Sequence, residues 1–163
     1  PLFGSYKTID VPALSSKEEN HAEERRILKG HFNGNASIEE YDAVVWRNHE
    51  ENKVDLFNCL GHFSMVMAYF DLADAIGHLS FGISEKMKRV YVDLDEMVRD
   101  VKSSSDDFTL VVSDHGMKQV GRYGDHSRNG FYSANRKLGL NLPRITDFYK
   151  MMVEVARSES TKD

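Results

Sequence analysis

The order of hydrophobic and polar positions predicts a charged start followed by helices and strands. Residues 1–36 are interrupted by proline and glycine, and the stretch from Ser15 to Lys29 is strongly charged. This pattern predicts an irregular lead-in in which a solvated helix is the only regular element expected. Ser37 and Glu40 then form a capping-box signature ahead of an apolar stripe, so a helix is expected over about 37–59.

Two short apolar runs separated by a longer periodic segment define the centre of the chain. The run Phe63–Phe70 is typical of a buried strand, with a buried helical segment as the alternative. Apolar residues then recur at three- and four-residue steps, which predicts an amphipathic helix over about 84–102. Phe108–Ser113 is uncharged and rich in β-branched residues, as a second buried strand would be. Strand, helix and strand together predict a βαβ unit, and therefore an α/β fold with a parallel sheet and a right-handed crossover.

The last third of the chain is richer in glycine than the segments before it. Glycines are frequent over residues 116–143, so long loops with little regular structure are expected there. Pro143 then precedes an apolar stripe that predicts a final helix ending near Arg157. Residues 158–163 are expected to fray.

Composition limits the class of protein. The chain has 163 residues, which suits one domain, and its 26 acidic against 21 basic residues give a net charge of −5. General nucleic-acid binding is therefore not expected, and no apolar run approaches the roughly 20 residues that a membrane span needs. The single cysteine, Cys59, excludes an internal disulfide and fits a reducing compartment, so a cytoplasmic location is predicted. Because the chain starts at Pro1 without a visible signal peptide, we expect a processed N-terminus or part of a longer protein.

Carboxylates and imidazoles cluster just past the predicted strands. Ligands of parallel α/β sheets bind outside the carboxyl ends of the strands, so side chains at these positions are expected to meet. Imidazole nitrogen and carboxylate oxygen bind zinc and similar divalent ions, although a mixed set does not fix the metal. The alternatives are a helix cap with surface histidines and a structural Asp–His pair. The candidate metal ligands are Asp74 and His78, Asp114 and His115, and His126, with Gly77 expected to let the first loop turn.

Two motifs carry a resemblance to a known family. Ser113–Met117 reads SDHGM, and Asp74–His78 reads D-x-x-G-H upstream of it. With the later Gly124–Ser127 segment, they resemble the type I phosphodiesterase/nucleotide pyrophosphatase branch of the alkaline phosphatase superfamily. The resemblance covers roughly residues 60–150. It implies a three-layer αβα fold with a mainly parallel sheet, incomplete on its N-terminal side, so that residues 1–163 are the C-terminal portion of a single catalytic domain.

The resemblance also implies a chemistry. The family hydrolyses phosphoric esters with two divalent ions, zinc in the first place and manganese as the alternative, bridged by a phosphoryl group. By this resemblance Asp74, His78 and His126 hold one ion, and Asp114 and His115 hold the second. A Thr or Ser nucleophile beside the second ion would be phosphorylated, and water would then cleave the phosphoryl group from it. Phosphomonoester, phosphonate and sulfate ester cleavage and phosphosugar mutase activity remain open within the superfamily.

The nucleophile and the sixth protein ligand are not recognisable in this sequence. Thr8 and Asp10 are the nearest residues of the required types, but no apolar strand is predicted before them. We therefore expect these groups upstream of Pro1 and expect the isolated chain to be inactive. The alternative function is a non-catalytic metal-binding or structural fragment of such an enzyme.

Partners follow from the same reasoning. The expected substrate is a small phosphate ester or nucleotide, because arginine forks suit phosphate oxygens; a solvated loop is the alternative. Unpaired edges of an incomplete sheet also predict a homo-oligomer formed through an exposed edge. The candidate substrate-binding residues are Arg128, Asn129 and Arg136.

Overall fold

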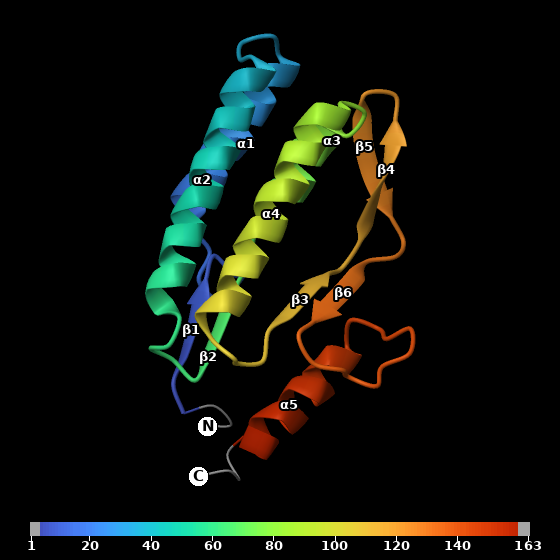
Figure 1. Cartoon of the computed structure of the whole chain (residues 1–163). Helices are drawn as coiled ribbons and strands as arrows, with labels where there is room; N and C mark the ends of the chain where they lie inside the picture. The colour runs from blue at the N-terminus through green and yellow to red at the C-terminus, as the bar shows by residue number, and fades with distance from the viewer. Residues whose placement is uncertain (1–3, 160–163) are drawn as a thin grey trace.

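The computed structural model describes residues 4–159 as a mixed α/β arrangement of helices and short strands (Figure 1). The helices α1 and α2 form a hairpin beside α4, and the strands of the C-terminal half lie on the opposite side of α4. The elements are β1 (Tyr6–Ile9), α1 (Glu18–Phe32), α2 (Ile38–Cys59), β2 (Met65–Ala68), α3 (Leu72–Ser80), α4 (Ser84–Ser104), β3 (Leu110–Ser113), β4 (Gly116–Val120), β5 (Tyr123–Ser127), β6 (Phe131–Ala134) and α5 (Asp147–Glu159).

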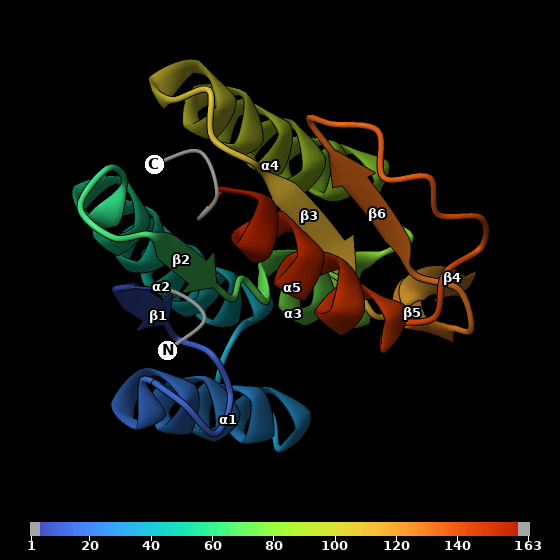
Figure 2. The same ribbon diagram turned by 90° about the horizontal axis from the view of Figure 1, so that it is seen from below.

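The described strands form three two-stranded sheets rather than one continuous sheet. Only β1 and β2 pair in parallel, from Tyr6 opposite Met65 to Ile9 opposite Ala68. The pairs β3–β6 and β4–β5 are antiparallel, so the mainly parallel sheet is not what the structure shows. The predicted βαβ unit is also wrong, because β2 and β3 lie in different sheets (Figure 2). The hydrophobic pattern identified both strands but carried no information on which partner would fill the hydrogen bonds of β3, and β6 fills them.

The long helices form where the apolar stripes predict them. Ser37 Oγ accepts a hydrogen bond from Glu40 N at 3.1 Å, and Ser37 N donates to Glu40 Oε2 at 2.7 Å, which confirms the capping box. The bounds of α2 and α4 agree with the predicted helices to within two residues. The helix α5 begins at Asp147, four residues after the proline that was expected to precede it directly. Phe148 of this helix packs edge-on against Tyr132 of β6, with 5.3 Å between the ring centroids.

Two expectations of irregular structure are wrong. The lead-in contains the helix α1, as expected for its charged stretch, but also the strand β1, and the glycine-rich segment contains β4, β5 and β6. Strands of four or five residues are too short for a convincing alternation, and β1 includes the charged Lys7. Residues 158 and 159 continue α5, and the rest of the expected frayed tail lies outside the described residues.

The core lies where α2, α3 and α4 meet. Val45, Leu72 and Val90 have no solvent exposure there, and Ile76 is 1% exposed. A second cluster beneath the β1–β2 pair joins Ile9 to the far ends of α2 and α4. The helix α3 packs on both α2 and α4, and its remaining side faces the hairpin β4–β5.

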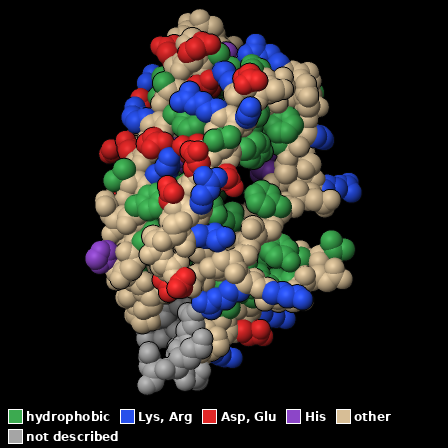
Figure 3. Space-filling model, viewed as in Figure 1, with side chains coloured by type: hydrophobic (Ala, Val, Ile, Leu, Met, Phe, Trp, Pro, Cys, Tyr) green, Lys and Arg blue, Asp and Glu red, His purple; other side chains and the backbone are tan. Residues whose placement is uncertain are grey.

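The outer face of the helices is polar. Lysine and arginine side chains alternate with acidic ones on the face seen in Figure 3, so that face has no field of a single sign. Among the described helices, none combines the length and the apolar character needed to cross a bilayer.

Candidate metal centre

The helix α3 carries the first two predicted ligands. Asp74 and His78 lie four residues apart on it and so share one face. Asp74 Oδ1 is 3.4 Å from His78 Nε2. The prediction that Gly77 lets a loop turn is wrong, because Gly77 is an interior residue of this helix.

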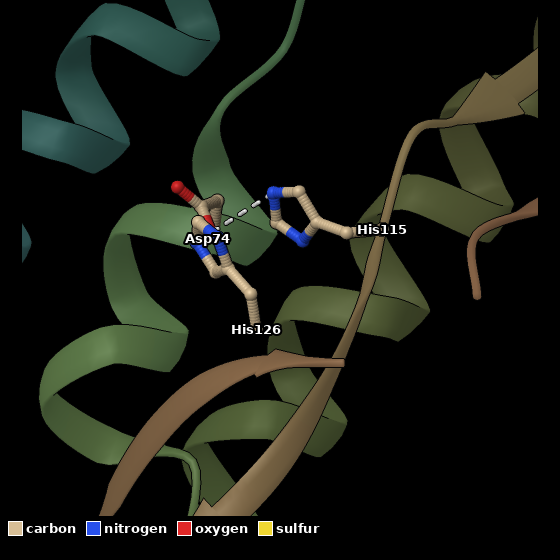
Figure 4. A group of neighbouring side chains, drawn as sticks. All are labelled: Asp74, His115 and His126. Atoms are coloured by element: carbon tan, nitrogen blue, oxygen red, sulfur yellow. Dashed lines mark hydrogen bonds and ion pairs between the residues drawn. The ribbon is translucent and has the colours of Figure 1, made fainter. Parts of the chain in front are cut away.

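Two further histidines reach the same carboxylate from separate parts of the chain (Figure 4). His126 of β5 places Nε2 at 3.2 Å from Asp74 Oδ1, and His115, in the turn between β3 and β4, places Nε2 at 3.8 Å. Asp114 Oδ1 lies 3.7 Å from His115 Nε2. All five predicted ligands are therefore neighbours.

Backbone carbonyls orient two of these rings. His78 Nδ1 lies 3.3 Å from Gly124 O, and His115 Nδ1 lies 3.1 Å from Gly116 O. A carbonyl can only accept, so each Nδ1 carries the proton and each neutral ring keeps an open lone pair on Nε2. Histidine ligands of metals are commonly fixed by such a bond from the second nitrogen.

The spacing of the ligand atoms matches a small tetrahedral ion. The three distances among Asp74 Oδ1, His78 Nε2 and His126 Nε2 are 3.0, 3.2 and 3.4 Å. Zinc bonded at 2.0–2.1 Å to tetrahedral ligands separates them by about 3.3 Å. Two unprotonated Nε2 atoms cannot bond to each other at 3.0 Å, so either a proton or a cation belongs between His78 and His126.

Close packing of α3 on the hairpin sets this spacing. A Cβ added to Gly124 of β5 would lie 2.7 Å from Gly77 O, and Cβ atoms added to Gly77 or Gly124 would both collide with Met117 Sδ. The absence of side chains at Gly77 and Gly124 lets β5 approach α3 closely enough for His126 to reach Asp74.

The cluster is open to solvent. Its side chains range from 25% exposed for His115 to 77% for Asp114, so an ion and a substrate have access. A groove of about 530 Å³ lies elsewhere, between α2 and α4 beside Trp46 and Arg89, and shares no residue with the cluster. Ligand chemistry, not concavity, marks the site.

The predicted substrate residues lie in two places. Arg128 and Asn129 belong to the loop between β5 and β6, which begins two residues after His126. Arg136 follows β6 at the other end of the β3–β6 pair, where its guanidinium donates to Asp106 O at 3.3 Å and lies over the Phe108 ring. Arg128 and Asn129 thus lie within three residues of His126 along the chain, whereas Arg136 lies at the opposite end of the β3–β6 pair.

Thr8 and Asp10 are placed differently from the expectation. A strand does precede Asp10, because β1 ends at Ile9 and runs parallel to β2. Asp10 is 3% exposed and accepts hydrogen bonds from Lys17 N and Asn52 Nδ2, both at 2.8 Å. Its other close partner is His21. The reason given against Asp10 is therefore wrong, yet its carboxylate is engaged by α1 and α2 rather than by Asp74.

Tyr69 is a neighbour that the motifs did not identify. Burial, followed by the negative charges of Asp71, Asp74 and Asp114, raises the pKa of Tyr69 to about 12. The phenol therefore stays protonated and can donate a hydrogen bond beside the cluster. Its position just past β2 was the available signal, since it precedes Asp71 at the edge where ligands were expected.

Comparison with known families agrees with the geometry. The family model of type I phosphodiesterase / nucleotide pyrophosphatase matches residues 8–136. The chain therefore belongs to this family of phosphoric ester hydrolases, which confirms the resemblance carried by the SDHGM and D-x-x-G-H motifs. Searches of curated proteins and of solved structures returned no match.

Proposed function

We propose that this chain supplies the metal-binding half of a phosphodiesterase or nucleotide pyrophosphatase site that uses two divalent ions. The observation that carries the proposal is the convergence of three imidazole Nε2 atoms on one carboxylate oxygen of Asp74. Asp74, His78 and His126 would hold one ion, and Asp114 with His115 would hold the second. Zinc suits the mixed nitrogen and oxygen ligands, and manganese is the alternative.

Bound ions would polarise phosphoryl oxygens and neutralise charge on the leaving oxygen. The chain's own residues then have distinct tasks. The carbonyls of Gly116 and Gly124 keep His115 and His78 in the tautomer that leaves Nε2 open. Arg128 and Asn129, in the loop after β5, would orient a small phosphate ester or nucleotide, and the neutral hydroxyl of Tyr69 would donate a hydrogen bond to it.

The Thr or Ser nucleophile and the sixth ligand are not among the residues gathered at the cluster. In line with the motif order, we propose that residues 1–163 are the C-terminal portion of a catalytic domain whose nucleophile is encoded upstream. The cytoplasmic location and the homo-oligomer also remain predictions.

A specific observation favours a second candidate, a metal-binding fragment without turnover. Asp10 directly follows the parallel strand β1, and it is already bonded to Lys17 N, Asn52 and His21. In that case the ions would stabilise the fold but no ester would be cleaved. Turnover separates the two candidates, whereas metal uptake is common to both.

Metal uptake tests the shared part of the proposal. Purified chain should bind zinc or manganese, and the double variant His78→Ala, His115→Ala should bind fewer equivalents of the ion, because each ion proposed at the cluster then lacks an imidazole ligand. Isothermal titration calorimetry measures the change, with His62→Ala as a control on an exposed histidine outside the cluster. An unchanged number of bound equivalents in the double variant would contradict the site.

Turnover tests the catalytic part. A longer product of the same reading frame should hydrolyse bis(4-nitrophenyl) phosphate and lose this activity with a chelator, while residues 1–163 alone should not turn it over. Chelator-insensitive hydrolysis would contradict the metal mechanism. Robust hydrolysis by the short chain would show that it contains a nucleophile after all.

A further inference from the structure

A second cluster of ligand-type atoms lies at the start of α3, on residues that the candidate metal centre does not use. His21 and Glu24 come from α1, and Asp71 immediately precedes α3. His21 Nδ1 is 3.9 Å from Glu24 Oε2 and 4.0 Å from Asp71 Oδ2. One ligand atom from each residue lies within 4.8 Å of the other two.

The second ring nitrogen of His21 and the second carboxylate oxygen of Glu24 are bonded to other residues. His21 Nε2 lies 2.8 Å from Asp10 Oδ1, and Asn48 Nδ2 donates to Glu24 Oε1. Because a carboxylate accepts, the His21 proton belongs on Nε2 in the neutral ring, which leaves Nδ1 open toward Glu24 and Asp71. A carboxylate on the second ring nitrogen is the arrangement that commonly orients a metal-ligating histidine.

The side chain of Asp71 does not cap α3, although its position would allow it. It is the N-cap residue of α3, yet its side chain makes no capping hydrogen bond. The carboxylate lies near His21 instead. A residue that could stabilise the helix end by capping is thus directed at the cluster.

The carboxylates of this cluster are largely shielded from solvent. Asp10 is 3% exposed and Glu24 is 8% exposed, so three carboxylates surround one imidazole with little solvent. Beside Asp10, the carbonyl oxygen of Asn52 has no hydrogen-bond partner among the described residues, although Asn52 is 2% exposed. A proton relieves the charge only in part, and a cation would relieve more of it.

We propose that His21 Nδ1, Glu24 Oε2 and Asp71 Oδ2 form a separate site for a zinc-like divalent ion. The ion would need each distance to His21 to shorten by roughly 0.6 Å, from the observed 3.9 and 4.0 Å to the about 3.3 Å of tetrahedral zinc ligands. Its role is structural: it ties α1 to the first residue before α3. Because Asp74 lies one turn further along α3, the ion also fixes the helix that carries the candidate metal centre.

The chain contains a comparable group that does not call for an ion. His49, Glu50 and Asp93 also lie close together, but Lys53 Nζ donates to Glu50 at 3.1 Å and to Asp93 at 2.9 Å. That ammonium already supplies the positive charge. In the His21 cluster, Lys17 contributes its backbone N–H to Asp10 while its side chain pairs with Asp55.

Counting bound zinc tests the proposal. The background is the triple variant His78→Ala, His115→Ala, His126→Ala, so that neither ion of the candidate metal centre contributes. This protein should still bind one equivalent of zinc by calorimetry, and adding Glu24→Gln should remove it. Adding Glu19→Gln instead, on the same helix but exposed, should leave the equivalent bound. Equal zinc binding with Glu24→Gln and Glu19→Gln would overturn the proposal.

A measurement on the unmodified chain covers the case in which Glu24→Gln does not fold. Nitrogen-15 NMR of the histidine rings distinguishes which ring nitrogen binds zinc. His21 should bind through Nδ1 and keep its proton on Nε2, whereas His78 and His126 should respond at Nε2. If the His21 signals do not change at a zinc excess that shifts those of His78 and His126, the proposal is wrong and the candidate metal centre is supported. If only the His21 signals change, the site at His21 is supported and the candidate metal centre is not.

Discussion

Replacing Gly124 with alanine should damage the candidate metal centre without touching any ligand. The new Cβ would lie 2.7 Å from Gly77 O, whereas carbon–oxygen contacts in proteins are about 3.3–3.6 Å. The obstacle is helix backbone, so β5 must retreat by at least about 0.6 Å. His126 lies two residues further along β5, and its Nε2 would move away from Asp74 Oδ1 from the observed 3.2 Å.

The expected magnitude follows from that displacement. Overpacking of this kind costs about 1–3 kcal/mol in the free energy of unfolding. Disturbing the groups that position a ligand lowers metal affinity by about 10–100-fold. Urea unfolding measures the first quantity and zinc titration the second, on the same preparation.

Gly77→Ala is the matched control, because it adds the same methyl group to the other side of the same contact. Its Cβ would meet the Sδ and Cε atoms of Met117, which are the mobile end of a flexible side chain. Alanine also favours the helix interior by roughly 1 kcal/mol over glycine. Zinc affinity should therefore change far less than in Gly124→Ala. Equal affinity in the wild type and Gly124→Ala would refute the idea that close packing of β5 on α3 sets the site.

Two further predictions concern stability. Ile76→Ala should lower the free energy of unfolding by about 2–5 kcal/mol in urea titration, because Ile76 is 1% exposed in the core; a loss below about 1 kcal/mol would contradict the packing of α3. Burial lowers the pKa of His49 despite its bond to Asp93, with Lys53 and Glu50 also facing it. The unfolded state therefore binds this proton more tightly, and His49 destabilises the fold as pH falls through about 6.5. The advantage of the wild type over His49→Gln should shrink between pH 7.5 and 5.5, and a constant difference would contradict the buried neutral ring.

The sequence predicted the long elements well because their signals are local. The capping box at Ser37 and the apolar stripe that begins at Ser84 each involve residues of a single helix, and the bounds of α2 and α4 agree with them closely. Pairing between strands is not local. The partner of β3 is β6, some twenty residues further on, across a glycine-rich stretch whose pattern is typical of loops. The strand β1 depends on β2 for its hydrogen bonds and has too few residues to be recognised alone.

The candidate ligands were found by residue type and motif, for partly incorrect structural reasons. Asp74 and His78 were expected in a turn at the edge of a parallel sheet, but they share a face of α3. The helix still brings them together, because four residues make about one turn. His21, Glu24 and Asp71 were not grouped in advance, since only the docking of α1 beside the start of α3 joins them.

The central claim is that Asp74, His78 and His126 surround one ion. Crystals of the chain soaked in zinc and measured at the zinc absorption edge test it directly, because the anomalous signal locates the ion without reference to any variant. The account predicts a peak about 2 Å from Asp74 Oδ1 and from the Nε2 atoms of His78 and His126. Zinc bound elsewhere on the chain, with no peak between these three side chains, would contradict it.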